Sequence, residues 1–375
     1  MYETAARMAA PKDSRIEFAN SLRGFAALGV ALGHFGGMFW TKPEVISYFT
    51  GTPILPTQNP LPWFSNIVLW PINVAVVGVA AFFLISGLVI PISIGRSSTV
   101  RFLAARVMRL FPTYMVCFTI VLAAIGAGSW YFGTSWPPIS NSDIAIHFLP
   151  GLRALFGSRD IDGVVWTLEV ELCFYLMCAL AAPLFRRQSV LVFAIPVALA
   201  VAASIPNIRP DFVVSVSPYL VFMFIGVCFY YLHTGAISGV SAIAVFSVTI
   251  ASTAVASFGV LQVSYMTEVA VSYLVGLAIF TLAYRFPNFV PKGRAVNFMA
   301  NISYPFYLVH AIPGYVLMLI IVGGGGVSRT FAVAAAICFG AVIAAAVHYL
   351  VELPTRRMSS DIQRNTPPIA ATKLS

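Results

Sequence analysis

Charged residues are scarce in this chain: Asp, Glu, Lys and Arg together make up 9% of its 375 residues. A soluble domain carries roughly 25% charged residues, so the composition excludes an ordinary soluble protein. Hydrophobic residues make up 59%, and the mean hydropathy is +0.88. Apolar runs recur from Ser21 to Val351 with no long polar stretch between them, which indicates a single membrane domain.

Several motifs of soluble chemistry are missing as well. No CxxC or Cys/His spacing of a metal site occurs, so no metal is predicted and the cysteines are interpreted as small buried apolar residues. Neither Ser86 nor Ser303 lies in the G-x-S-x-G elbow of a hydrolase. The glycine run 323–326 lacks the lysine of a phosphate-binding loop and is interpreted as a tight turn. The five cysteines are Cys117, Cys173, Cys178, Cys228 and Cys338.

About ten stretches are apolar enough to cross a bilayer, which takes about 20 helical residues. We therefore expect an all-α integral membrane protein with a cytoplasmic N-terminal segment at 1–19, a membrane domain at 20–354 and a cytoplasmic tail at 355–375. Arg23 and His34 interrupt the first apolar stretch, so it is interpreted as a retained span and not a signal peptide. The expected spans are residues 20–40, 71–93, 107–128, 164–185, 189–206, 214–233, 237–257, 265–284, 297–321 and 330–351.

The lysine and arginine distribution predicts the orientation of these spans. An even number of spans puts both termini on the same side of the membrane. The termini and the loops on that side then hold sixteen basic residues, and the loops on the other side hold five. Cytoplasmic loops concentrate basic residues, so both termini should be cytoplasmic and the long loops at about 41–70 and 129–163 should fold over the outer mouth. Lipid headgroups and insertion explain the net charge of +9, and no nucleic-acid partner is expected. The sixteen are Arg7, Lys12, Arg15, Arg96, Arg101, Arg106, Arg109, Arg186, Arg187, Arg285, Lys292, Arg294, Arg356, Arg357, Arg364 and Lys373, and the five are Lys42, Arg153, Arg159, Arg209 and Arg329.

Ionisable residues inside a span are costly, so each is a candidate for function. Arg23 and His34 lie eleven residues apart, close to three helical turns, and should share a face at levels about 16 Å apart. His310 belongs to the ninth span and should reach the same outer half as His34. A boundary arginine reaching for the headgroups and a packing histidine are the structural alternatives.

Two glutamates near the outer end of the fourth span face different ways. Glu169 and Glu171 are about 200° apart on a helix. Glu171 shares a stripe with Thr167 and Tyr175, which makes it the interior candidate, whereas Glu169 is assigned to the outer interface. Glu171 should lie at the depth of both histidines, and three ionisable groups at one level indicate a reaction or transport site.

Cytoplasmic arginines supply a second candidate site. Arg106 and Arg109, at i and i+3, share a helical face and can form a forked anion site, with positive-inside anchoring as the alternative. Glu352 ends the last span at the same level and is expected to pair with one of these arginines. The remaining ionisable residues near spans carry no motif and are interpreted as structural; they are His147, His233, Glu268 and His348.

Five segments together resemble the family-3 membrane acyltransferases, which act on O-antigen, exopolysaccharide, nodulation-factor and macrolide acceptors. Their order, spacing and placement on the expected spans extend from residue 23 to 354. Two departures are Thr167, where the family usually has Ser, and Leu172, where many members have a second acid. The segments are R-x-x-A-x-x-x-V-x-x-x-H from Arg23 to His34, F-F-x-I-S-G from Phe82 to Gly87, R-x-x-R-L-x-P from Arg106 to Pro112, W-T-L-x-x-E-x-x-F-Y-L from Trp166 to Leu176, and S-Y-x-x-Y-L-x-H from Ser303 to His310, with E-x-P following at Glu352 to Pro354.

The resemblance implies about ten spans in the bacterial inner membrane, an acyl-CoA donor taken from the cytoplasm, with acetyl the commonest acyl group, and an acceptor at the outer face. Arg106 and Arg109, with Arg23, would hold the phosphates of the donor. His34 would accept the proton of a hydroxyl on a carbohydrate or lipid-linked glycan, oriented by Glu171 or His310. Acylation of His34 itself, in a ping-pong reaction, is the other possibility.

Two other classes of protein fit part of the pattern. A proton-coupled secondary transporter of a small molecule would use the buried His, Glu and Arg residues as a proton relay. It should show related halves or paired broken helices, and the sequence has no clear internal repeat. An intramembrane hydrolase fits if water replaces the sugar.

Overall fold

The structure is a computed structural model that describes residues 14–56, 58–67, 70–95, 97–205, 211–258 and 263–364. Among the basic residues counted above, Arg7, Lys12, Arg96, Arg209 and Lys373 lie outside the described residues. The described part of the chain forms helices and no strands, which confirms the all-α class.

The helices follow one another through short turns, except at the two long loops. Apart from the π-helices η1 and η4 and the 3-10 helices η2 and η3, all are α-helices. In chain order they are α1 (Ser14–Leu32), η1 (Gly33–Met38), α2 (Phe39–Thr41), α3 (Pro43–Thr50), α4 (Pro62–Ile67), α5 (Val74–Gly95), α6 (Thr99–Phe132), α7 (Asn141–His147), α8 (Arg153–Phe156), α9 (Val165–Leu180), α10 (Ala182–Arg186), η2 (Val190–Phe193), α11 (Ala194–Ser204), α12 (Asp211–Thr234), α13 (Gly239–Phe258), α14 (Val263–Arg285), η3 (Pro287–Phe289), α15 (Arg294–Val309), α16 (Ala311–Gly323), α17 (Arg329–Val347), η4 (His348–Glu352) and α18 (Leu353–Arg364).

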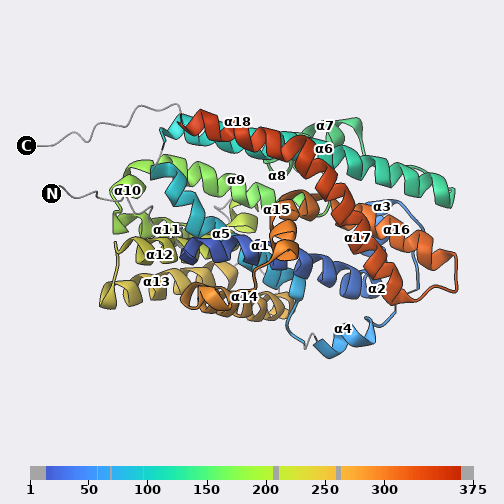
Figure 1. Cartoon of the computed structure of the whole chain (residues 1–375), viewed down its shortest axis with the longest axis horizontal. Coiled ribbons are helices and arrows are strands. Elements are labelled where there is room, and N and C mark those ends of the chain that lie inside the picture. The colour runs from blue at the N-terminus through green and yellow to red at the C-terminus, as the bar shows by residue number, and fades with distance from the viewer. Residues whose placement is uncertain are drawn as a thin grey trace, which may run out of the picture.

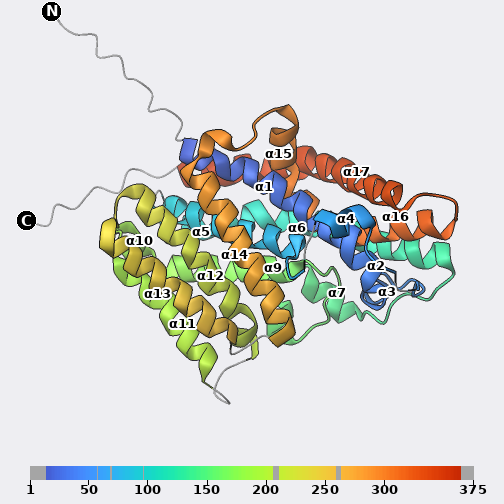
Figure 2. The ribbon, with the colours of Figure 1, turned by 90° about the horizontal axis from the view of Figure 1, so that it is seen from below.

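Helix α5 lies at the centre of the bundle and contacts α1, α9, α12 and α14 (Figure 1). It is apolar on all sides, as expected for a helix surrounded by other helices. Helices α10 to α14 gather on one side, and α6 and α17 lie on the other (Figure 2). Helix α18 packs against α6. Long-range packing of α1 against both α5 and α15 places the first and ninth expected spans side by side.

Seven helical segments of the described chain are long and apolar enough to cross a membrane. Each of the ten expected spans coincides with a helical segment, but three fail this test as continuous spans. Span 164–185 corresponds to α9, which has only 16 residues before the chain turns into α10. Span 189–206 corresponds to the short η2 and α11, and span 297–321 is broken. Ten spans therefore remain a prediction, while a multi-pass membrane protein is supported.

The expected ninth span is two helices, not one. Helices α15 and α16 are bent by 74° to each other, and His310 lies between them. Pro313 follows three residues later in the first turn of α16. Since proline has no backbone N–H, the carbonyl of Val309 loses its helical partner there, which accounts for the bend.

Contacts between loops divide the bundle into two ends that match the alternation of the expected spans. At one end Arg186 donates to the carbonyl of Ser97 at 3.1 Å, and Ser359 donates to the carbonyl of Ala105 at 2.8 Å. At the other end Arg329 donates to Gln58 at 2.9 Å. Which end faces the cytoplasm stays a prediction from the charge distribution.

The two long loops contact each other, while their position at the outer mouth stays a prediction. Arg159 joins them, because its guanidinium donates to the carbonyl of Tyr48 at 2.8 Å and stacks over the Tyr48 ring. Helix α7 begins with a capping box between Ser140 and Asp143. Hydrogen bonds from the hydroxyls of Ser140 and Ser158 lower the pKa of Asp143 to about 2.

Candidate active site

Four of the six site residues that the sequence predicts, His34, Glu171, Arg23 and Arg109, line two cavities, whereas His310 and Arg106 line neither. The larger, about 990 Å³, is lined by His34 and is called the histidine cavity here. The smaller, about 90 Å³, is lined by Arg23, Arg109 and Arg356 and is called the arginine cavity. Val79 and Tyr307 line both, so the two cavities meet at these side chains.

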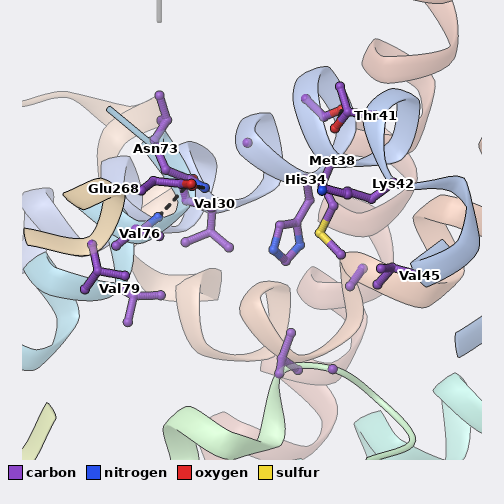
Figure 3. Close-up of a pocket in the computed structure, with 18 of the residues that line it drawn as sticks. Val30, His34, Met38, Thr41, Lys42, Val45, Asn73, Val76, Val79 and Glu268 are labelled. Carbon is purple, nitrogen blue, oxygen red and sulfur yellow. Dashed lines mark hydrogen bonds between the residues drawn. The ribbon is translucent and has the colours of Figure 1, made fainter. Parts of the chain in front are cut away.

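His34 reaches the histidine cavity from a local irregularity in the first span. It is the second residue of η1, a π-helical turn between α1 and α2. Such turns within α-helices are frequent at functional sites. In Figure 3 the half-buried His34 side chain points into the cavity, while Asn73 and Glu268 lie together at another part of its wall.

The break in the ninth span brings His310 against His34. Nε2 of His310 lies 3.1 Å from Nδ1 of His34, and the two rings are stacked with centroids 5.1 Å apart. The other nitrogen of His310, Nδ1, lies 2.8 Å from the carbonyl oxygen of Tyr307 and 3.2 Å from that of Phe306. The pair joins two segments 276 residues apart in sequence.

These contacts select one arrangement of protons for neutral rings. A carbonyl oxygen only accepts, so Nδ1 of His310 must donate and its Nε2 is left as an acceptor. Nδ1 of His34 then donates to that acceptor. Nε2 of His34 consequently carries the free lone pair, and a free lone pair on a positioned imidazole can accept a proton.

Glu171 is not the partner of either histidine. Its carboxylate accepts hydrogen bonds from Ser86 at 3.2 Å and from the hydroxyl of Tyr175, and it lines the arginine cavity. The sequence predicts Glu171 or His310 as the group that orients His34, and the geometry places only His310 there. Glu171 instead lines the same cavity as Arg23 and Arg109.

The expected fork of Arg106 and Arg109 is not formed. Arg106 is 6% exposed, donates to Ser93 and lies against the Tyr175 ring, 5.4 Å from its centroid. Arg109 faces the arginine cavity, where Arg23 and Arg356 complete the cationic wall. Helical spacing puts Arg106 and Arg109 on one face, but the buried Arg106 contacts Ser93 and Tyr175 and does not line the cavity. Arg356, which the sequence assigns to the tail, lines the cavity beside Arg109.

In the described part of the chain Glu352 pairs with His348 and Arg356 and not with Arg106 or Arg109. It lies 2.6 Å from Nδ1 of His348 and 3.8 Å from Nη1 of Arg356. Both His348 and Glu352 belong to η4, the second π-helical turn of the described chain, and both are buried. Glu352 thus positions Arg356 at the edge of the arginine cavity.

Two further glutamates take up structural positions. Glu169 lies near the start of α9 and is 2% exposed, because the guanidinium of Arg153 covers it at 2.5 Å. Glu268 accepts a hydrogen bond from Asn73 at 2.5 Å at the wall of the histidine cavity. The sequence gives no signal for either pairing, because the partners come from distant loops.

A pair of hydroxyls separates the two cavities. The hydroxyls of Tyr307 and Thr167 are joined by a hydrogen bond of 2.9 Å between α15 and α9. The family motif usually has Ser at the position of Thr167, and the hydroxyl that remains here makes this contact. Because Tyr307 lines both cavities, this hydrogen bond lies where the histidine cavity and the arginine cavity meet.

The family model for acyltransferase 3 proteins, described as an acyltransferase domain, matches residues 16–350. The chain therefore belongs to the acyltransferase 3 family, which confirms the resemblance in its motifs and its class as an acyltransferase. It is also similar to Nodulation protein 10 of Rhizobium leguminosarum bv. viciae, with 34% identity over 125 residues. This match covers 29% of the chain and 34% of the relative, so the chain spans about a third of that protein's length. No solved structure matches the chain.

Proposed function

We propose that this protein transfers an acyl group, most simply acetyl, from acyl-CoA to a hydroxyl of a carbohydrate or lipid-linked glycan. The observation that carries the proposal is the hydrogen bond between His34 and His310, at a cavity that meets a cluster of arginines. The family supplies the reaction class. The geometry supplies a candidate base and a candidate anion site.

The donor would bind from the arginine side. Coenzyme A carries phosphates, and guanidinium groups bind phosphate through paired, charge-assisted hydrogen bonds. Arg23, Arg109 and Arg356 supply these donors at the arginine cavity. At about 90 Å³ this cavity is smaller than the roughly 300–1,000 Å³ of typical ligand pockets. We therefore infer that α9 and α15 separate at Tyr307 to admit the pantetheine arm.

The acceptor would occupy the histidine cavity. Its volume of about 990 Å³ suits a sugar. Aromatic side chains, including Trp166 and Tyr219, provide faces for the C–H surface of a sugar ring, and Asn73 and Glu268 provide hydrogen-bonding groups for its hydroxyls.

His34 would act as the general base. As the acceptor oxygen attacks the thioester carbonyl, Nε2 of His34 takes the hydroxyl proton, and the new C–O bond forms while the C–S bond breaks. The imidazolium then returns its proton to the thiolate of coenzyme A. His310 and the carbonyl of Tyr307 hold the reactive tautomer of His34, the part that a carboxylate plays in hydrolase triads.

The setting of this reaction is proposed to be the bacterial inner membrane, with both termini in the cytoplasm. Ten membrane crossings would then consist of the seven long segments, the bent pair α15 and α16, and the shorter α9 and α11. The arginine cavity would face the cytoplasmic supply of acyl-CoA. The histidine cavity would lie below the outer loops.

Purified protein in lipid nanodiscs, supplied with acetyl-CoA, tests the proposal. We expect thiol release that requires a sugar acceptor and is lost in His34→Ala. Thiol release without any acceptor would point to a hydrolase.

A transporter remains the second candidate because one observation favours it: transporters carry broken helices at their binding sites, and α15 and α16 form such a pair. Uptake of a labelled solute without acyl-CoA consumption would support that class.

A further inference from the structure

A buried histidine in the second long loop has no hydrogen-bond partner among the described residues. His147 closes α7, and its side chain is 0% exposed. Neither ring nitrogen has a partner within the described residues. A buried polar group without a partner is rare and calls for an unseen water or ion. The face of the ring is covered by Phe118, with centroids 4.8 Å apart.

Two carboxylates flank this imidazole. Nε2 of His147 lies 3.8 Å from Oδ1 of Asp162, too far for a hydrogen bond. One ligand atom each from His147, Asp160 and Asp162 lie within 4.8 Å of one another. Two ligands about 2.1 Å from a tetrahedral zinc ion are roughly 3.4 Å apart, so a small contraction would bring all three into coordination.

Charge favours a cation at this place. Asp162 is buried and Asp160 half-buried, and each raises the free energy of the other's ionised form. Arg153 interacts with both, but its guanidinium is committed to Glu169 at 2.5 Å. Two carboxylates and one imidazole are the groups that lie here, and a bound divalent cation would balance the charge of the two carboxylates.

The surrounding hydrogen bonds would orient the ligands as outer partners do in metal sites. Oδ2 of Asp162 accepts from the hydroxyl of Tyr114 at 3.1 Å, while Oδ1 accepts from the backbone N–H of Val164 and Val165. Oδ1 of Asp160 accepts from the N–H of Gly163 at 3.0 Å. These bonds hold both carboxylates in place independently of His147.

We propose that His147, Asp160 and Asp162 bind one divalent zinc ion, which fastens α7 to the turn before α9. One imidazole with two carboxylates is a donor set that zinc accepts, whereas magnesium and calcium prefer oxygen ligands alone. Asp162 also lines the histidine cavity, so the ion would brace the wall of the proposed active site. This inference does not depend on the proposed reaction.

Metal content and zinc-dependent stability test the site in full-length protein purified without a histidine tag. We expect about one zinc per chain, a fall in Tm on treatment with EDTA, and recovery with Zn²⁺ but not Mg²⁺. Asp160→Asn keeps the acceptor for the N–H of Gly163 but loses the charge, so zinc affinity should fall by about tenfold or more. Asp143→Asn, the same change in the same loop outside the trio, should leave affinity unchanged.

Two results would overturn the site: no saturable zinc binding by wild type, or equal zinc affinity in Asp160→Asn and Asp143→Asn. Either would make His147 and Asp162 a buried ion pair. Elution of each variant as a single folded species excludes misfolding as the cause of lost binding.

Discussion

At the residue scale, the pairing of two imidazoles is the feature that the chemistry depends on. A histidine acts as a base only when the correct nitrogen faces its substrate, and His310 sets that nitrogen on His34 through a fixed backbone carbonyl. His310 itself is fully buried, so its part is to position His34 and not to contact the acceptor.

Replacing the two histidines should therefore have unequal effects. His34→Ala removes the base and should lower kcat by roughly 10²- to 10⁴-fold. His310→Ala should lower kcat less, by about tenfold to a hundredfold, with little change in KM for acyl-CoA. His310→Asn, whose amide oxygen can accept from His34, should recover part of the rate. The readout is acceptor-dependent thiol release.

His233→Ala is the matched control, because His233 lies near the end of α12 and lines neither cavity. Equal activity of His310→Ala and wild type would remove the positioning role. A loss in His310→Asn as complete as in His310→Ala would indicate that packing, and not the hydrogen bond, matters at this position.

Substitutions of the arginines should also have unequal effects, on KM at two positions and on Tm at a third. Hydrogen bonds to charged groups contribute about 1.5–3 kcal/mol, so Arg109→Ala and Arg356→Ala should each raise KM for acyl-CoA by roughly tenfold to a hundredfold. Arg106→Ala should instead lower Tm, since Arg106 packs between the Phe102 and Tyr175 rings. Steady-state kinetics and thermal unfolding distinguish the two outcomes. A larger KM effect for Arg106→Ala than for Arg109→Ala would restore the fork predicted from the sequence.

At the element scale, the core depends on a close crossing between α5 and α12. A Cβ added to Gly87 would lie 2.0 Å from the carbonyl oxygen of Met223, and one added to Gly226 would lie 2.3 Å from that of Leu84. Both contacts are to backbone, which cannot move aside as a side chain does. Only glycine at both positions allows the two helices to meet.

Alanine at either glycine should therefore force the helices apart. We expect Gly87→Ala and Gly226→Ala each to destabilise the protein by about 1–3 kcal/mol or more. The combined variant should cost less than the sum, because the first substitution already separates the helices. Thermal unfolding of detergent-purified protein measures the effect.

Gly95→Ala controls for the loss of a glycine in the same helix, since a Cβ there meets nothing within 4 Å. Its Tm should match that of wild type. An unchanged Tm in Gly87→Ala would mean that α5 and α12 can separate at little cost.

Hydropathy predicted the helices well, because an apolar segment in a bilayer must form its backbone hydrogen bonds internally, as a helix does. Every expected span coincides with helix. The bend at His310 and the π-helical turn at His34 were not predicted, although Pro313 lies in the sequence as a signal for the bend. Residue counting gives length and depth, whereas local deviations from α-helix depend on tertiary packing.

At the scale of the whole molecule, the depth of a residue in the membrane was not enough to predict which side chains contact one another. His34, His310 and Glu171 were predicted at one level, but Glu171 faces the arginine cavity and the two histidines meet at the other. Helical wheels fix angles within one helix. They do not fix how α9 is rotated relative to α15, which is decided by contacts such as that between Thr167 and Tyr307.

The direction of transfer across the membrane rests on topology, which single cysteines can test. Ser142 is exposed on α7 at the end predicted to be outside, and Arg187 is exposed at the opposite end. With the five native cysteines replaced, Ser142→Cys should react with an impermeant maleimide in intact cells. Arg187→Cys should react only after permeabilisation.

Retained acyl transfer in the cysteine-free background is the control that the fold is intact. If Arg187→Cys reacted in intact cells and Ser142→Cys did not, the orientation would be inverted. The arginine cavity would then face away from the cytoplasmic acyl-CoA pool, and the assignment of this cavity to the donor would fail whatever the kinetics of its arginines. Labelling of both positions as predicted would leave His34 between a cytoplasmic donor and an acceptor reaching it from outside.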